Sequence, residues 1–426
     1  MSRRSIRSCL LRHDSEILLR RRPRTADAVP GHWDGITGGL DDDPVDVVAA
    51  ALGPDRPDGT ITHVRTGEPV AAELADGDGR IRVVPSLLEL DVEFPTARPS
   101  VAPTGEGRWL QPPGVDRLQC VPWLRPAYDR VAPSIETVAA DTTHGAEYLS
   151  RRAVEVLRDR AAERHRQASR PNAIAELRRE ARDLQRARPA MAVVARRIDR
   201  VMYSAGDARP GPVCRCAVGL LGGLRTELDR VVEEATRTIT ADRVGTLSTS
   251  GTVRSAIERI DPSHVLVAES RPGGEGRTTA QTHSGPDRSV SLTADAAMPW
   301  LVANGAVDAV MVGADTVLGN GSVANKVGTF AAAMAGQVVD VPVYVLAHSD
   351  KITWKTDFDP EYRPLVDCPI PDGIEGIDAA APIFDLTPFA NFDGVITERG
   401  ALERADIEAV GRRARTMRSW CDRTLP

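Results

Sequence analysis

The C-terminal part of the chain alternates short apolar runs with helical segments, and this alternation limits the possible fold more than any other feature. The runs that have the length and composition of buried strands are 244–247, 265–268, 290–293, 309–312 and 341–346. Strands that alternate with helices form a parallel sheet with right-handed crossovers. We therefore expect an α/β fold whose doubly wound, Rossmann-like sheet begins near residue 240. Ligands should bind at the carboxyl ends of its strands.

Two other types of sequence precede this region. Residues 133–239 carry apolar positions at helical spacing, which predicts a helical subdomain. We interpret the many arginines of this segment as solvated helix faces rather than as a stripe that binds nucleic acid. Residues 1–132 are rich in Pro, Gly and Asp and contain short alternating runs, which predicts a small α+β domain. The Rossmann-like subdomain with the parallel sheet is expected over residues 240–426.

Composition and charge argue against several classes of function. The 426 residues carry a net charge of −6, so no overall basic field attracts nucleic acid or an acidic membrane. No apolar run approaches the ~18 residues that a membrane-spanning helix requires, and the first residues do not form a signal peptide. The six cysteines show no metal-ligand spacing, and we expect neither a metal nor a cofactor. These features predict a cytoplasmic protein.

Polar and glycine residues follow the predicted strands. Small hydroxyl and glycine residues before a helix expose backbone N–H groups that can bind a phosphate, and lysine, arginine and asparagine add side-chain donors. An aspartate at a strand end can transfer protons if burial raises its pKa. The side chains in these positions are Ser248, Ser250, Glu269, Arg271, Asp295, Asp315, Asn325, Lys326 and His348.

Each of these residues also has a purely structural interpretation. A serine before a helix is commonly its N-cap, Glu269 and Arg271 can form a structural ion pair, and Asp315 can cap the following helix. The functional interpretation depends on the convergence of the strand ends at one edge of one sheet. Lysine is rare enough that each copy is conspicuous, and the chain contains Lys326, Lys351 and Lys355.

Residues 310–329 (VMVGADTVLGNGSVANKVGT) resemble the signature G-A-D-x(4)-N-G-x-(V/I)-x-N-K-(I/V)-G-T of the translation initiation factor 2B alpha/beta/delta family. That superfamily also contains ribose-1,5-bisphosphate isomerase and methylthioribose-1-phosphate isomerase. The resemblance extends over roughly residues 135–410 and implies a helical subdomain, a Rossmann-like subdomain and usually a dimer. The further matching segments are RPAMA from Arg188, ESRPGGEGR over 269–277, DAA from Asp295, PVYV from Pro342 and TERG from Thr397.

The resemblance also implies roles for individual residues. In the isomerases of this superfamily, a cysteine after the first strand and the aspartate of G-A-D transfer protons during aldose–ketose conversion. The aspartate position is Asp315, whereas the cysteine position holds Ser248, whose hydroxyl is a far weaker acid than a thiol. The positions implied for the phosphate or ligand site are Arg188, Ser250, Arg271, Arg277, Asp295, Asn325 and Lys326.

The serine at position 248 decides the predicted function. We expect a non-catalytic, translation-related or regulatory protein of initiation factor 2B type that binds a sugar phosphate or a nucleotide. The expected assembly is a homodimer or a larger homo-oligomer, with translation initiation factor 2 as a candidate partner. The alternative is an aldose–ketose isomerase of the ribose 1,5-bisphosphate type that uses Asp315.

A second resemblance covers the N-terminal part. Residues 5–22 and the segment PGHWDGITGG (30–39) resemble the opening hairpin and G-G turn of a Nudix domain. Nudix hydrolysis needs a helix that presents several glutamates to Mg²⁺, but residues 50–51 are Ala-Ala where Arg-Glu is expected, and residues 54–55 are Pro-Asp where Glu-Glu is expected. We interpret residues 41–43 (Asp-Asp-Asp) as a solvated loop. The prediction is a degenerate Nudix-like domain without hydrolase activity.

Overall fold

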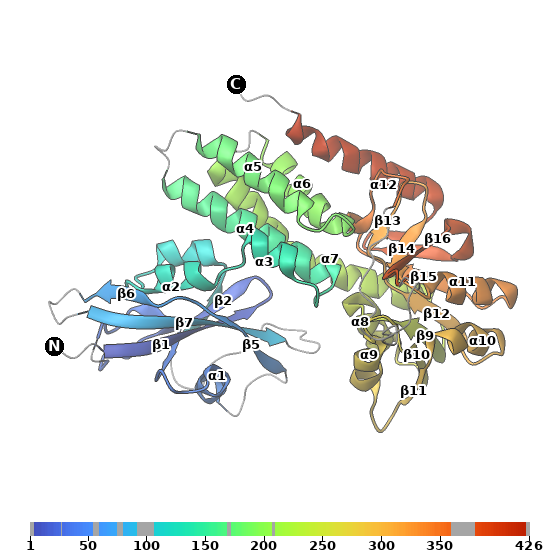
Figure 1. Ribbon diagram of the computed structural model, residues 1–426, viewed down its shortest axis with the longest axis horizontal. Coiled ribbons are helices and arrows are strands. Elements are labelled where there is room, and N and C mark those ends of the chain that lie inside the picture. The colour runs from blue at the N-terminus through green and yellow to red at the C-terminus, as the bar shows by residue number, and fades with distance from the viewer. Residues whose placement is uncertain are drawn as a thin grey trace, which may run out of the picture. The chain divides into compact units, whose positions relative to one another are not determined.

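The computed structural model divides into two compact units (Figure 1). The first unit comprises Met1–Ser134 and Arg158–Arg166, and the second comprises Ile135–Leu157 and Gln167–Pro426. The structure describes residues 4–26, 28–53, 59–74, 80–91, 106–167, 172–206, 209–358 and 380–422. Within these residues, no helix combines the length and apolar character that crossing a bilayer requires.

A mixed sheet is the frame of the first unit. Strand β1 (Arg4–His13) pairs in parallel with β7 (Arg80–Asp91) and antiparallel with β2 (Glu16–Arg21), and β5 (Thr60–Thr66) pairs with β7. The sheet has the order β3-β2-β1-β7-β5, and β4, β6 and β8 pair outside this path. The bounds of the remaining strands are Trp33–Asp34 (β3), Ile36–Gly38 (β4), Val70–Glu73 (β6) and Gly107–Leu110 (β8).

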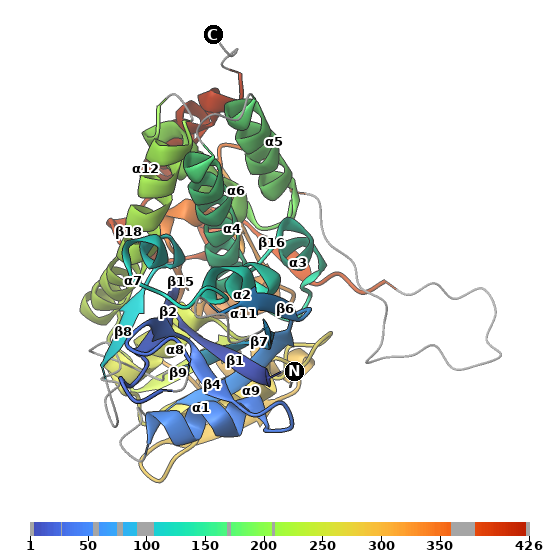
Figure 2. The same ribbon diagram turned by 90° about the vertical axis from the view of Figure 1, so that its left-hand side faces the viewer.

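One helix covers each face of this sheet (Figures 1 and 2). Successive side chains of a strand point to opposite faces, so Leu10 joins one apolar cluster and Leu11 the other. Helix α1 (Pro44–Leu52) closes the cluster of Leu11 through its buried residues Val48 and Leu52. Helix α2 (Leu124–Val131), preceded by the 3-10 turn Pro112–Arg117, closes the cluster of Leu10.

The acidic segment before α1 has a structural role. The carboxylate of Asp43 accepts hydrogen bonds from the backbone N–H groups of Val45 and Asp46 at 2.8 and 3.2 Å, and it therefore caps the helix. Asp42 accepts a hydrogen bond from the N–H of Gly39 at 2.7 Å. Helix α1 itself carries Asp46 as its acidic residue. Residues 54–55, which are Pro-Asp where a Nudix domain has Glu-Glu, lie outside the described residues.

Helices form the first part of the second unit. The middle of helix α6 buries Val194, Ile198 and Val201 at helical spacing. Several arginines of this region are buried rather than solvated, because carboxylates and carbonyls of neighbouring helices pair with them; Arg197 is fully buried. The helix bounds are Ile135–Ala140 (α3), Ala146–Arg166 (α4, whose last residues belong to the first unit), Ala173–Arg186 (α5), Ala192–Ser204 (α6) and Pro210–Thr238 (α7).

The expected parallel sheet forms the second part of this unit. Its order is β11-β10-β9-β12-β15-β17-β18, in which every pair is parallel except β17–β18. The register aligns Val244 with Val265 and Val310 with Val343. The strand bounds are Arg243–Leu247 (β9), His264–Ala268 (β10), Ser289–Thr293 (β11), Ala309–Val312 (β12), Val343–Leu346 (β15), Gly394–Thr397 (β17) and Gly400–Leu402 (β18).

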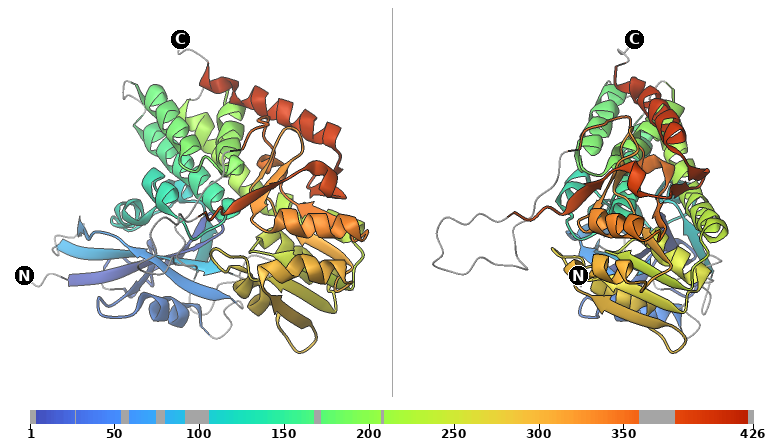
Figure 3. Two further views of the ribbon diagram at one scale, coloured as in Figure 1. Left: turned by 45° about the vertical axis from the view of Figure 1, so that its right-hand side comes forward. Right: turned by 90° about the vertical axis from the view of Figure 1, so that its right-hand side faces the viewer.

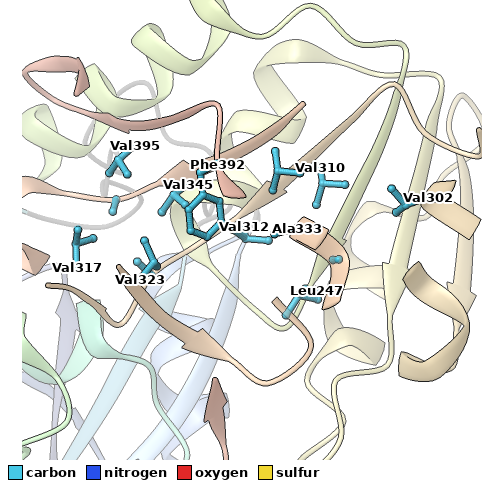
Figure 4. Packing of buried hydrophobic residues seen from close by; sticks show 14 of the residues in the cluster. Leu247, Val302, Val310, Val312, Val317, Val323, Ala333, Val345, Phe392 and Val395 are labelled. Atoms are coloured by element: carbon cyan, nitrogen blue, oxygen red, sulfur yellow. The ribbon is translucent and has the colours of Figure 1, made fainter. Parts of the chain in front are cut away.

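Helices cover both faces of this sheet (Figure 3). Side chains of α10, α11 and α12 share one apolar cluster with Val310 and Val312, and side chains of α7, α8 and α9 share the other with Met311. Figure 4 shows Val310 and Val312 packed among residues of the first cluster. The helix bounds are Gly251–Ile260 (α8), Gly276–His283 (α9), Met298–Ala303 (α10), Thr329–Val338 (α11) and Arg404–Met417 (α12).

A small antiparallel sheet carries the end of the sequence signature. Strand β13 (Thr316–Val317) pairs with β14 (Val323–Lys326), which pairs in turn with β16 (Phe384–Thr387). The turn between β13 and β14 contains Gly321 at φ 89°, a left-handed conformation that glycine adopts without strain. This hairpin places Asn325 and Lys326 directly after the fourth parallel strand, next to residue 315, whose N–H donates to the carbonyl of Ala324.

Candidate functional site

The carboxyl ends of the central strands meet at one edge of the seven-stranded sheet. Strands β10, β9, β12 and β15 are consecutive in this sheet and all parallel, so their carboxyl ends point the same way. Figure 4 shows Leu247 and Val312, the last residues of β9 and β12, in the same apolar cluster. The residues that follow, Ser248 and Gly313, therefore begin at the same edge.

Hydrogen bonds hold Ser248 against the end of the neighbouring strand. Its N–H donates to the Ser270 hydroxyl at 2.6 Å, and its carbonyl accepts a hydrogen bond from the Thr279 hydroxyl, also at 2.6 Å. Ser248 and Ser270 have φ values of 60° and 71°, which are uncommon for residues with a side chain. The hydrogen bonds compensate for this conformation, in which the chain turns sharply at both strand ends.

Ser250, Gly313 and Asn325 lie together at this edge. Ser250 is the N-cap of α8, and its hydroxyl accepts from the N–H of Val253 at 3.4 Å. A Cβ atom on Gly313 would lie 2.9 Å from the Ser250 hydroxyl oxygen and 3.9 Å from Oδ1 of Asn325. Only glycine therefore allows this close approach. The amide nitrogen of Asn325 donates to the Thr329 hydroxyl at 2.9 Å.

Lys326 is almost completely buried and is paired with a carboxylate. Its ammonium donates to the backbone carbonyl of Pro272 and to Oε1 of Glu275 at 3.1 Å, with Oε2 at 2.9 Å. Glu275 is also the residue whose carbonyl accepts a hydrogen bond from the Thr249 hydroxyl at 2.9 Å. Lys326 is therefore linked through Glu275 to the segment that follows β9.

The arginines that follow β10 also have an acidic partner. Arg271 and Arg277 both contact the carboxylate of Glu269, Arg271 at 3.1 Å, and these hydrogen bonds hold the pKa of Glu269 below its usual range. Asp295 accepts hydrogen bonds from the backbone N–H groups of Ser270 at 2.6 Å and Arg271 at 2.7 Å. In this structure the Asp295 carboxylate thus orders the turn after β10.

Arg188 lies in the segment that attaches helix α6 to the sheet. Its guanidinium donates to the backbone carbonyl of Asp141. Two residues further, the carbonyl of Ala190 accepts from the Thr316 hydroxyl at 3.0 Å, and that hydroxyl accepts from the N–H of Ala192 at 3.1 Å. The start of α6 is therefore attached to the residue directly after Asp315.

The carboxylate of Asp315 interacts with a lysine that was not among the predicted site residues. Lys351 lies just beyond β15, and its ammonium donates to the carbonyl of Ala314, the residue before Asp315. Burial lowers the pKa of Lys351, and although the carboxylates of Asp315 and Glu147 act in the opposite direction, the pKa stays below its usual value. An amine and a carboxylate with complementary charges thus lie at the same strand ends.

Arg197 of helix α6 is fully buried and connects the turn before Lys351 with the helices. The Arg197 guanidinium donates to both carboxylate oxygens of Glu147 at 2.9 and 2.6 Å and to the Ser150 hydroxyl at 2.7 Å. It also lies 3.7 Å from the carboxylate of Asp350. Burial alone would raise the pKa of Glu147, but Arg197 outweighs this effect and lowers it to about 2.

A second ion-pair network fixes the segment before Lys351. Arg200 donates to both oxygens of Glu227 at 3.1 and 3.0 Å and to Asp350. The Asp350 N–H donates to Nδ1 of His348 at 3.0 Å, so Nε2 carries the proton that His348 donates to Glu227 at 2.9 Å. Burial would raise the pKa of Glu227, but these hydrogen bonds lower it.

This second network is built from ion pairs. Ligand atoms of Glu227, His348 and Asp350 lie within 4.8 Å of one another, a spacing that would also suit a metal ion. The guanidinium of Arg200, however, already contacts both carboxylates, and the guanidinium of Arg197 lies 3.7 Å from Asp350, so that the two arginines offset the two negative charges. We therefore assign the group a structural role in holding the turn at residues 349–351.

The sequence predicts the strand ends but not the partners that come from the helices. Glu147 and Arg197 are 50 residues apart in sequence and meet only in the folded chain. Lys351 had two signals, since it is one of few lysines and follows a predicted strand. Glu398, which follows β17, accepts a hydrogen bond from the N–H of Ser349 at 2.9 Å, and its strand was not predicted.

Comparison with known proteins places this architecture in a family. The model of the initiation factor 2 subunit family (IF-2B) matches residues 142–404. A methylthioribose-1-phosphate isomerase of Gemmatimonas aurantiaca is 34% identical over 251 residues, which cover 52% of this chain and 70% of that protein. An isomerase of the same name from Methylococcus capsulatus is 35% identical over 162 residues, 36% of this chain and 46% of the relative. The chain thus spans about half the length of this second relative.

Two solved structures support the same fold. The translation initiation factor eIF-2B of Pyrococcus horikoshii OT3 matches with a TM-score of 0.53 at 24% identity, over 64% of this chain and 97% of that one. The 5-methylthioribose 1-phosphate isomerase of the same organism matches with a TM-score of 0.51 at 20% identity, over 66% and 86%. At these identities the likeness concerns the fold alone.

The comparisons correct the predicted function. The sequence predicts a non-catalytic binding protein because Ser248 replaces a cysteine, but several relatives at 30–35% identity are isomerases. That prediction was wrong, and the isomerase alternative agrees better with these relatives. The family model covers more than half of the chain and includes every strand of the parallel sheet. The chain therefore belongs to the initiation factor 2 subunit family.

Proposed function

We propose that the second unit is an aldose–ketose isomerase that acts on a ribose-type sugar phosphorylated at C1. The observation that carries this proposal is the Asp315 carboxylate at the end of β12, beside the Lys351 ammonium and on the same edge as Ser248. Relatives at 30–35% identity are methylthioribose-1-phosphate isomerases, which supports the same class of reaction.

The proposed reaction transfers a proton from C2 to C1 of the sugar. A base must remove the C2 proton, and the same group can return it to C1. Asp315 is the proposed base because it is a half-buried carboxylate at a strand end. The next residue, Thr316, is hydrogen-bonded to Ala190 and Ala192, which attaches the strand end that carries Asp315 to the start of α6.

The phosphate site is proposed at the N-terminus of α8 and the neighbouring hairpin. Ser250 and Asn325 provide short polar side chains there, and the backbone N–H groups at the start of α8 favour an anion. Lys326 adds positive charge, partly balanced by Glu275. Arg188, Arg271, Arg277 and Asp295 are proposed as surrounding residues that order the loops.

Two sugars with a C1 phosphate are candidate substrates. The relatives favour methylthioribose 1-phosphate, and ribose 1,5-bisphosphate differs from it by a second phosphate in place of the methylthio group. The test is the steady-state conversion of each sugar to its ketose by the full chain. We expect conversion of one of them, and a loss of at least about 100-fold in kcat for Asp315→Asn.

The control is Asp287→Asn, which changes an exposed carboxylate outside the site and should leave conversion unchanged. Absence of conversion of both sugars by the wild-type chain, or equal rates for Asp315→Asn and wild type, would contradict the proposal.

We propose further that residues 1–132 form a Nudix-like domain without hydrolase activity, followed by a helical subdomain (133–239) and a Rossmann-like subdomain (240–426). Helix α1 supports this proposal, because Asp46 is its acidic residue and Asp43 is engaged as its cap. A dinucleoside polyphosphate or nucleoside diphosphate sugar incubated with the full chain and Mg²⁺ should release no product. Product release that depends on Mg²⁺ and on Asp46 would refute it.

We also propose that the chain forms a homodimer. Helices α10 and α11 expose Trp300 at 65% and Val338 at 77%, together with Phe330 and Met334, and such apolar exposure is typical of interaction surfaces. Light scattering coupled to size-exclusion chromatography should give twice the mass of 45.9 kDa. A monomeric mass at micromolar concentration would contradict this assembly.

A further inference from the structure

Because Ser248 stands where the isomerases of this superfamily have a cysteine, the site needs another group that can transfer a proton. A proton-transfer site for an aldose–ketose conversion needs two groups, and the Ser248 hydroxyl is too weak an acid to be one of them. We propose that Lys351 is the second proton-transfer group of this site, acting together with Asp315. This inference rests on the proposed isomerase function and adds a residue to it.

The position of Lys351 is defined by the strand that precedes it. Strand β15 runs parallel to β12 as its neighbour, so the residues after the two strands lie side by side. Lys351 ends the 3-10 turn Ser349–Lys351, and its ammonium reaches back across the edge to the carbonyl of Ala314. The ammonium therefore donates a hydrogen bond to the backbone of the residue that directly precedes Asp315.

The turn that carries Lys351 is held on two sides. On one side, Glu398 after β17 accepts hydrogen bonds from the N–H and the hydroxyl of Ser349. On the other side, Asp350 contacts Arg197 and Arg200 of helix α6. Such fixation of a side chain at a strand end is what a proton-transfer group needs, because the geometry must be set before the substrate binds.

The charges that face Lys351 come from three elements. Asp315 lies between β12 and β13, Glu147 lies on α4, and Arg197 lies on α6. Burial lowers the pKa of Lys351, and Arg197 adds to this effect, whereas Asp315 and Glu147 oppose it. An amine whose pKa falls below the usual lysine value donates a proton more readily.

Other side chains at this edge are less suited to the role. Lys326 is engaged by Glu275 and by the carbonyl of Pro272, and Lys355 is exposed. His348 donates through Nε2 to Glu227 and accepts through Nδ1, so both ring nitrogens are occupied. Lys351 is the amine whose charge is coupled to Asp315.

The proton balance of the proposed reaction closes with these two groups. As the bond between C1 and the ring oxygen breaks, the Lys351 ammonium gives a proton to that oxygen, and the Asp315 carboxylate takes the proton from C2, so that a C1=C2 double bond forms. The 2-hydroxyl then returns a proton to the Lys351 amine while Asp315 gives its proton to C1. The product is the ketose, with the phosphate still on C1 and both side chains in their starting state.

The first test reads the amine directly and needs no turnover. Because the chain has only three lysines, lysine labelled with ¹³C gives three Cε signals, and Lys351→Gln identifies one of them by its loss. We expect the Lys351 signal to titrate below the ordinary value of 10.5, and to titrate lower still in Asp315→Asn, which removes an opposite charge. A titration midpoint of Lys351 at the ordinary value would overturn the proposal, and so would a midpoint that is the same in wild type and in Asp315→Asn.

The second test measures turnover of the full chain. Lys351→Gln and Lys351→Arg should each lose at least about 100-fold in kcat with little change in KM, and the alkaline limb of the wild-type profile of kcat/KM against pH should disappear. Thermal melting checks that both variants fold, and Lys355→Arg is the matched control. If the wild type converts the sugar and the two variants do so equally well, the role of Lys351 is refuted while the proposed function stands. If the wild type converts neither sugar, the proposed function fails and the role of Lys351 fails with it.

Discussion

The Glu147–Arg197 pair allows a quantitative prediction about the stability of the second unit. Arg197 is fully buried and donates to both oxygens of Glu147, and it lowers the pKa of that carboxyl from 4.5 to about 2 against the effect of burial. A difference of about 2.5 between the two pKa values corresponds to about 3.4 kcal/mol. Because 31% of the Glu147 side chain is exposed, solvent screening reduces this to about 2–3 kcal/mol.

The substitution Glu147→Gln should therefore lower the free energy of unfolding by about 2–3 kcal/mol at pH 7. The folded-state pKa lies below the unfolded one, so this stabilisation is present above the unfolded value and is lost as the pH falls towards the folded value. Between pH 7 and pH 3.5 the difference between wild type and variant should shrink by about 1 kcal/mol. The assay is urea denaturation followed by circular dichroism at both pH values.

The matched control is Glu233→Gln on helix α7, an exposed glutamate that forms an ion pair with Arg237 at 3.8 Å. Its effect should be below about 0.5 kcal/mol at either pH, since exposed pairs contribute little. An effect of Glu147→Gln that equals the control, or that is the same at pH 7 and pH 3.5, would refute the reasoning.

Three further predictions concern single residues. Burial raises the pKa of Asp199 from 3.8 to about 6, so the stability of the wild type should fall as the pH rises from about 4 to 6. Asp199→Asn should gain about 2 kcal/mol relative to wild type over that range, measured by urea denaturation at both pH values; a constant difference would contradict this. Gly313→Ala would place a methyl group 2.9 Å from the Ser250 hydroxyl and should cost about 1–3 kcal/mol, measured by thermal melting; an unchanged melting temperature would speak against the close approach. Lys326→Met should raise KM for the phosphorylated sugar more than it lowers kcat, in steady-state kinetics; the reverse pattern would argue against phosphate binding.

The central parallel strands could be predicted from the sequence because they are buried on both faces of the sheet. Strands β12 (AVMV) and β15 (VYVL) are short apolar runs between helices, which is how central parallel strands appear in a sequence. Strand β17 (GVIT) was not predicted, since a four-residue run that opens with glycine gives a weak strand signal. In the first unit, the alternating runs around Asp14 and Ser15 correspond to β1 and β2.

The candidate site could be predicted only in part, because sequence order shows strand ends but not their partners. Ser250 and Asn325 were expected near one another, and the space around Gly313 brings them together. The burial of Arg197 could not be predicted, since the carboxylates that compensate for it lie on another helix and in the turn after β15. The functional prediction was wrong because it rested on one position, Ser248. It did not include Lys351, which the structure places at the same edge of the sheet.

The most direct measurement of the central claim follows the sugar itself. The full chain is incubated with methylthioribose 1-phosphate and with ribose 1,5-bisphosphate, each labelled with ¹³C at C2, and the C2 signal is recorded over time. An isomerase built on Asp315 and Lys351 moves this signal from the range of an alcohol carbon to that of a ketone in the wild type, and leaves it in place in Asp315→Asn. An unchanged C2 signal in the wild type with both sugars would contradict the account.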